Sequence, residues 1–216
     1  MLTEDYIIRM INLGIAALLR IVGLKKDGKH EEGLQLIDLT LEQLLGLRAS
    51  VVKGLDDDRL YYILTRNDEI DTRRLILIAD LLKLEGDIYI EQGRKVDSRE
   101  SHARALKYTL EVARLDPMQD PVELAQKIDT LVQALGLPML QPDTLWSLFC
   151  YYEESGVFQK AEEALLELAE RPDVRPVLLP EVIAFYERMQ SNPNSELQSV
   201  DEKLAEWKRN SRGYTV

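Results

Sequence analysis

The chain has 216 residues, a net charge of −11 and a hydrophobic content of 45%. A chain of this length and apolar content can bury a core of its own and does not have the composition of a disordered protein. Its negative charge is unfavourable for binding nucleic acid or an anionic membrane surface, so we expect neither as a partner. Because Cys150 is the single cysteine, no intramolecular disulfide can form, and we expect a cytoplasmic location.

The excess negative charge is concentrated in one part of the chain. Residues 115–190 hold 5 basic and 14 acidic side chains, whereas residues 1–114 hold 18 basic and 20 acidic ones. A basic partner surface would therefore meet the chain in this region. A solvated acidic face that keeps the protein soluble is the more ordinary explanation.

The first predicted helix covers residues 6–24 and is apolar around most of its circumference. Glu4 and Asp5 stand in its first turn, where the helix dipole favours acids, and an acidic start also argues against a secretory leader. Arg9 and Arg20 make a membrane span unfavourable, since each is costly at bilayer depth. Such a helix has to be covered inside the fold or in a subunit interface. The residues that we predict for a homo-oligomer interface are Ile11, Leu18 and Ile21.

Helical hairpins are predicted from apolar residues at three- and four-residue steps and from glycines at the turns between them. The hairpins cover residues 3–46, 72–115 and 143–170, with turn glycines at Gly28, Gly93 and Gly156. The number of residues from one turn glycine to the next is close to twice the length of a helical repeat of about 34 residues. The pattern therefore indicates hairpins that recur along the chain, with less regular helices between them.

Further helices are predicted between and after these hairpins. Asp56 and Asp71 each stand before an apolar run, where an aspartate can cap a helix. A calcium site at residues 56–58 would need alternating ligands and a central glycine, which this stretch lacks. Other predicted helices cover residues 122–135, 181–189 and 200–208, and Pro172, Pro176 and Pro180 mark a joint before the second of them.

The central hairpin carries a recognisable pattern of small and large residues: Gly86, Tyr89, Gly93, Ser98, Ala105 and Leu110. At this spacing the stretch resembles a tetratricopeptide repeat, a helix-turn-helix unit of about 34 residues. The resemblance implies an all-α fold of about ten antiparallel helices. Their hairpins would stack as a short tetratricopeptide-repeat-like α-solenoid over residues 1–190. Residues 191–216 would add a linker, a C-terminal helix and a tail on the same domain.

The N-terminal half shows a second resemblance. Residues 5–9 and 41–47 look like a small bacterial family of repeat-like proteins to which no activity has been assigned. This resemblance implies no catalytic residues.

Candidate catalytic and metal-binding groups are sparse. His30 lies in a predicted turn and His102 at a core-facing position, and neither has the neighbours of a metal site or a Ser-His-Asp triad. Cys150 stands in an apolar helix, where a lone cysteine usually packs as a small hydrophobic residue. Residues 25–29 lack the first glycine and the Ser or Thr of a phosphate-binding loop. We therefore expect no metal, no cofactor and no enzymatic activity.

Neighbouring carboxylates do not form an acid-base pair either. Glu85 with Asp87, and Glu153 with Glu154, lie one or two residues apart and so point in different directions on a helix. They are predicted to be surface charges.

The resemblance to tetratricopeptide repeats implies a binding surface. In that superfamily the first helix of each hairpin lines a concave face that binds extended peptides or helices. The matching positions here are Asp80, Lys83, Asp87 and Glu91 in the central hairpin and Asp143, Trp146, Glu153 and Glu154 in the third. Chaperone-binding members hold a terminal carboxylate with lysine and asparagine, whereas Asp87 follows Lys83 by one turn and would repel that group. The resemblance therefore implies a partner protein or peptide of basic or mixed charge.

Two functions remain open. The first is a non-enzymatic adaptor or scaffold that binds a partner peptide or helix in its concave face. The alternative is a self-associating structural protein that forms a homo-oligomer through its apolar first helix. An enzyme is the weakest of the three classes that we considered.

Overall fold

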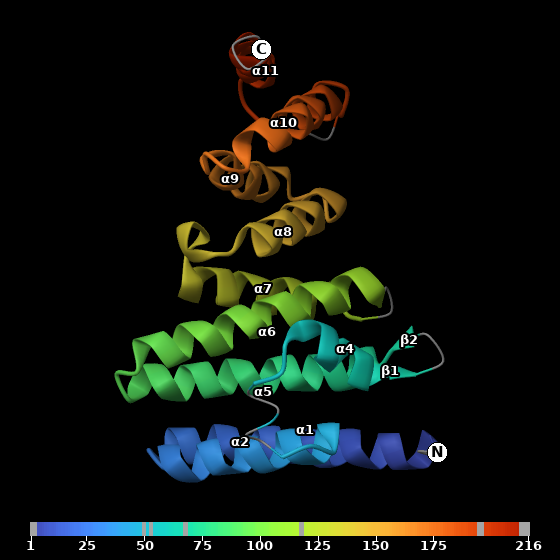
Figure 1. The fold of residues 1–216 in the computed structure, drawn as a ribbon, viewed down its shortest axis with the longest axis vertical. Coiled ribbons are helices and arrows are strands. Elements are labelled where there is room, and N and C mark those ends of the chain that lie inside the picture. The colour runs from blue at the N-terminus through green and yellow to red at the C-terminus, as the bar shows by residue number, and fades with distance from the viewer. Residues whose placement is uncertain are drawn as a thin grey trace. The chain divides into compact units, whose positions relative to one another are not determined.

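The computed structural model describes residues 4–48, 51, 54–66, 69–116, 119–193 and 197–211 (Figure 1). Within these ranges the chain folds into ten α-helices, with a hairpin of two-residue strands and one short 3-10 helix. The predicted all-α class is confirmed, and the solenoid arrangement stays a prediction. The helices divide into two compact units, Met1–Leu135 and Gly136–Val216.

The first unit is built on two helical hairpins. They are α1 (Glu4–Lys26) with α2 (His30–Leu45) and α5 (Thr72–Glu91) with α6 (Lys95–Leu115). Between them lie α4 (Asp57–Leu64), β1 (Thr65–Arg66) and β2 (Glu69–Ile70), and the two strands pair antiparallel. Helix α7 (Pro121–Leu135) follows and packs against α6. Both α1 and α2 contact α5, so α5 is covered by helices on several sides.

The helix boundaries follow from local signals in the sequence. The side chains of Asp56 and Asp71 accept hydrogen bonds from the backbone N–H of Arg59 at 2.8 Å and of Arg74 at 3.2 Å. Both predicted N-caps are therefore confirmed. Gly93 turns the chain between α5 and α6 with a φ of 75°, a left-handed conformation that costs other residues more.

Close helix packing in the first unit depends on glycines. A Cβ atom at Gly14 of α1 would lie 3.2 Å from Leu77 Cδ1, and one at Gly33 of α2 would lie 3.0 Å from Ile88 Cδ1. Leu77 and Ile88 both belong to α5. Because the two glycines have no side chain, the first hairpin can approach this helix closely.

One charged side chain joins the end of α2 to the start of α5. The Arg74 side chain is 7% exposed; its Nε donates to Asp71 Oδ2 at 3.0 Å and its Nη1 to the carbonyl oxygen of Leu44 at 3.4 Å. A carbonyl in the last turn of α2 has no partner within its own helix. Arg74 supplies that partner from the next hairpin.

The second unit contains η1 (Leu137–Met139), α8 (Pro142–Glu154), α9 (Phe158–Ala169), α10 (Arg175–Gln190) and α11 (Val200–Ser211). Its core includes Phe149 of α8 and Phe185 of α10, whose ring centroids lie 5.6 Å apart. Helix α10 begins six residues before the predicted start at residue 181. Pro176 stands in its first turn, where no N–H donor is needed, and Pro180 is accommodated inside the helix. The predicted joint is therefore wrong at these two prolines.

Helix α11 is attached to the rest of the second unit by a buried carboxylate. Glu162 of α9 accepts a hydrogen bond from Tyr186 Oη of α10 at 2.6 Å and from Lys203 Nζ of α11 at 2.7 Å. Glu162 is 8% exposed. Burial, followed by the Glu162 carboxylate, raises the pKa of Tyr186 well above its usual range, so the tyrosine keeps its proton for this bond.

Candidate functional site

A groove of about 390 Å³ runs between α1, α5, α6 and α7 in the first unit. Its apolar lining is made by Leu18, Ala79, Leu84 and Leu131. Its charged lining is made by Asp80, Lys83, Glu123 and Lys127, and its neutral polar lining by Thr109, Gln126 and Thr130. Two of the predicted partner-binding residues, Asp80 and Lys83, therefore line a groove.

Asp80 is held inside this groove by a lysine from α7. Lys127 Nζ lies 2.7 Å from each carboxylate oxygen of Asp80 and 3.2 Å from Glu123 Oε1. Burial raises the pKa of Asp80, and the hydrogen bonds and charge of Lys127 oppose that rise. The aspartate is 29% exposed, so the predicted acidic surface is only partly open to solvent here.

Asp87 lies further along α5, and its carboxylate contacts lysine side chains from two helices. Lys83 Nζ is 2.7 Å and Lys25 Nζ 3.3 Å from Oδ2, while His102 Nε2 is 3.1 Å from Oδ1. Burial alone would raise the pKa of Asp87. The hydrogen bonds from His102 and Lys83, with the charges of Lys83 and Lys25, outweigh burial and hold that pKa well below its usual range.

Glu91 completes this row of charges at the end of α5. Its carboxylate lies 2.7 Å from His30 Nε2 and 3.4 Å from Lys25 Nζ, and its side chain is 40% exposed. Three acids of α5, Asp80, Asp87 and Glu91, thus contact cations of α1, α7 and α5 itself, as well as His30 at the start of α2. Lys25 and Lys127, which are far from α5 in the sequence, thus offset part of the negative charge at these positions, and their role in binding a partner stays a prediction.

The predicted residues of the third hairpin lie on α8 in the second unit. Asp143 and Glu154 are exposed, and Glu153 accepts hydrogen bonds from Arg188 at 2.8 and 3.0 Å. Trp146 is 39% exposed, and its ring centroid is 5.3 Å from that of Phe149. The single groove that would join these residues to those of α5 stays a prediction.

The three residues predicted for an oligomer interface have different environments. Ile21 is fully buried inside the first unit, so it is not available to another chain and that assignment is wrong. Leu18 lines the groove and Ile11 is half-buried. The apolar residues that α1 exposes on one face are Ile8 at 44%, Ile15 at 46% and Leu19 at 73%.

The histidines and the cysteine have structural surroundings. His102 is 2% exposed, as its predicted core-facing position requires, and its Nε2 lies near both Asp87 and the Lys83 carbonyl oxygen at 3.2 Å. A Cβ atom at Gly86 would collide with the His102 ring, so this glycine is what lets the histidine lie across α5. Burial, then the charges of nearby glutamates, raises the pKa of the half-buried Cys150 thiol.

The comparisons with known proteins identify a family. Residues 1–201 match the family of unknown function DUF6483. The chain belongs to this family. No curated protein and no solved structure matches the chain. The predicted kinship with a family that has no assigned activity is confirmed and covers far more than the N-terminal half, whereas the resemblance to tetratricopeptide repeats stays a prediction.

Sequence reasoning missed several residues of this DUF6483 chain. Glu85 was predicted to be a surface charge, but it is 4% exposed and lines a second cavity. The lysines that neutralise the acids of α5, Lys25 and Lys127, were not singled out either. Lys127 stands one turn from Leu124 and Leu131 and next to Ile128, which places it beside the buried face of α7. That spacing is the one signal that could have identified it.

Two absences hold for the described part of this DUF6483 chain. None of its helices there is both long and apolar enough to cross a membrane. In the same ranges, histidine, cysteine, aspartate and glutamate side chains form no group of three that could hold a metal ion.

Proposed function

We propose that this protein is a non-enzymatic interaction module that binds a segment of a partner protein in the groove between α1, α5, α6 and α7. The observation that carries the proposal is the groove itself, whose lining combines apolar and charged side chains. A groove of this kind can bind one or two apolar side chains of a partner segment, and its few fixed polar groups orient that segment. The resemblance to tetratricopeptide repeats supports the proposal, because the first helix of each hairpin lines the binding face in that superfamily.

The charges around the groove favour a partner segment of mixed charge over a purely basic one. Asp80 is already bonded to Lys127, and Asp87 to Lys83 and Lys25. A basic segment would have to compete with these lysines for the same carboxylates. A segment that brings both an acid and a base can contact both members of the Asp80–Lys127 pair without breaking it.

A steric block tests this proposal without disturbing the ion pairs. The full chain is immobilised beside Thr130→Trp, which fills the groove from an exposed position on α7, and beside Val122→Trp as the matched control. Val122 is 63% exposed on the same helix and does not line the groove. A partner identified by mass spectrometry from cell lysate is then titrated against all three proteins.

The expected result is a loss of affinity of about tenfold or more for Thr130→Trp, with Val122→Trp matching the wild type. Circular dichroism would establish that both variants are folded. Equal binding by all three proteins would remove the groove as the site.

We propose self-association through α1 as the second candidate function. Ile8, Ile15 and Leu19 form an exposed apolar row on one face of this helix, and Leu19 is 73% exposed. Light scattering of the wild type and of Leu19→Glu tests it. A dimeric wild type with a monomeric variant supports the candidate, whereas a monomeric mass for both removes it.

A further inference from the structure

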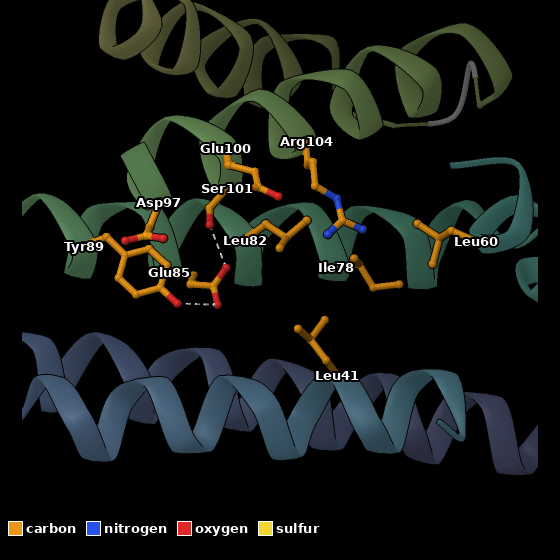
Figure 2. A pocket seen from close by; sticks show the side chains of 10 residues that line it. All are labelled: Leu41, Leu60, Ile78, Leu82, Glu85, Tyr89, Asp97, Glu100, Ser101 and Arg104. Atoms are coloured by element: carbon orange, nitrogen blue, oxygen red, sulfur yellow. Dashed lines mark hydrogen bonds between the residues drawn. The ribbon is translucent and has the colours of Figure 1, made fainter. Parts of the chain in front are cut away.

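A second cavity, of about 190 Å³, lies between α2, α4, α5 and α6 (Figure 2). One part of its lining is apolar and consists of Leu41, Leu60, Ile78 and Leu82. An engineered cavity of about 150 Å³ is known to hold benzene, so this volume suits a ligand of modest size. The groove described above has none of these lining residues, so the two sites are separate.

One end of the cavity carries a buried carboxylate in a fixed orientation. Glu85 accepts a hydrogen bond from Tyr89 Oη at 3.2 Å on one oxygen and from Ser101 Oγ at 2.7 Å on the other (Figure 2). Because an ionised carboxylate only accepts, both hydroxyls must donate to it. Asp97, which is paired with Arg94 at 2.9 Å, and the exposed Glu100 add two more acids to the same lining. This end of the cavity therefore suits a cationic group.

A guanidinium group lies further along the same cavity. Arg104 follows Ser101 by one turn of α6 and projects toward Ile78 and Leu60 (Figure 2). Its Nε and Nη2 donate to Tyr108 Oη at 3.3 and 3.1 Å, which fixes the plane of the group. Arginine has five N–H donors, so donors remain for a ligand after these two bonds. A planar guanidinium is well suited to bind a carboxylate.

We propose that this cavity binds a small zwitterion, with its ammonium group on Glu85, its carboxylate on Arg104 and a short apolar stem over Leu82 and Ile78. Glu85 and Arg104 carry groups of opposite sign in the lining of one cavity, and Leu82 lies between them in Figure 2. A ligand with one charge can make a charge-assisted contact with one of these two groups only. The class of ligand is an amino acid or an aminoalkyl carboxylate.

Isothermal titration calorimetry on the full chain tests this proposal with three probes of similar length. They are 6-aminohexanoate, hexylamine, which lacks the carboxylate, and hexanoate, which lacks the ammonium group. We expect 6-aminohexanoate to bind at least about tenfold more tightly than either of the others, because each end contributes a charge-assisted hydrogen bond. Equal affinity of the three probes, or no binding by any of them, would overturn the proposal.

Two variants assign the ends of the ligand. Glu85→Gln should reduce the affinity for 6-aminohexanoate to that for hexanoate, and Arg104→Gln should reduce it to that for hexylamine. Arg114→Gln on the outer part of α6 and Glu163→Gln on α9 are the matched controls, since both side chains are exposed. In Glu85→Gln the amide oxygen can still accept from one of the two hydroxyls, and the amide N–H can donate to the oxygen of the other. Arg104→Gln tests the proposal independently at a less buried position. Unchanged preference among the probes in both folded variants would contradict the assignment.

Discussion

Lys127 Nζ on α7 lies 2.7 Å from both carboxylate oxygens of Asp80 on α5. The two residues are 47 positions apart, and their contact joins two of the helices that line the groove. With exposed fractions of 24% and 29%, neither charge is fully solvated, so solvent screens this pair less than an ordinary surface pair.

A double-mutant cycle with Asp80→Asn and Lys127→Met should therefore show a favourable coupling of about 1 kcal/mol in the free energy of unfolding. Urea unfolding of the wild type, the two single variants and the double variant measures it. The exposed pair Arg94 and Asp97 is the control, and we expect no measurable coupling there. Coupling that is equal in both pairs would show that the groove does not shield Asp80.

Replacement of Asp87 by asparagine should cost about 2 kcal/mol of stability at neutral pH, since charge-assisted bonds to lysine and histidine are lost. The folded-state pKa of Asp87 is depressed. Its contribution is therefore present above the unfolded value of 3.8 and is lost as the pH falls toward the folded pKa. The difference between the wild type and Asp87→Asn should thus shrink at about pH 3, measured by urea unfolding. A difference that grows in acid would have the wrong sign for this explanation.

Gly86→Ala should destabilise the protein by about 1–3 kcal/mol, because the added methyl group collides with the ring of the buried His102. Gly23→Ala is the matched control: its Cβ would meet nothing within 4 Å, and alanine favours a helix. That variant should be more stable than the wild type by about 0.5–1 kcal/mol. The midpoint temperature of thermal unfolding is measured for both variants and the wild type. If both variants shift this temperature in the same direction, the packing described for Gly86 is contradicted.

Tyr186→Phe and Lys203→Met should both weaken the attachment of α11 through Glu162. Each loses a hydrogen bond to a buried carboxylate, worth about 1.5–3 kcal/mol. Hydrogen exchange in residues 200–211 should accelerate in both variants. Lys208→Met removes an exposed ion pair to Glu187, not a contact with Glu162, and should leave the exchange nearly unchanged. Identical exchange in all four proteins would mean that Glu162 does not hold this helix.

The thiol of Cys150 should react slowly with a disulfide reagent near neutral pH. Burial raises its pKa, and the charges of Glu154 and Glu153 raise it further, so the reactive thiolate is scarcer than in an unperturbed cysteine. Unfolding in urea should restore a normal rate. Rapid labelling of the folded chain, monitored by absorbance, would be inconsistent with this environment.

The helical hairpins could be predicted because their signals are local. A glycine at a turn and apolar residues at three- and four-residue steps act over a few positions, and the structure has helix pairs in all three predicted ranges. The caps at Asp56 and Asp71 are local in the same way. Short-range steric and hydrogen-bonding rules are sufficient for these features.

The ionic contacts of the candidate site could not be predicted, because they join distant parts of the chain. Lys25 meets Asp87 across 62 positions. The wrong prediction for Glu85 has a related cause. The spacing of residues along a helix shows which of them share a face, but it does not show how many of these faces are packed against other helices. Since α1, α2 and α6 all contact α5, both Glu85 and Asp87 lie on covered faces. The number of neighbours around a helix is a property of the tertiary fold.

The close approach of the first hairpin to α5 through Gly14 and Gly33 also has a consequence during synthesis. The hairpin ends at Leu45, whereas α5 ends at Glu91. Because translation adds about 5–20 residues per second, the surfaces of the first hairpin that will contact α5 stay exposed for several seconds after their synthesis. Until then the carbonyl of Leu44 also lacks its bond from Arg74. Slow translation of the intervening segment would lengthen this exposure, so codon choice between these helices should influence how much of the nascent protein aggregates.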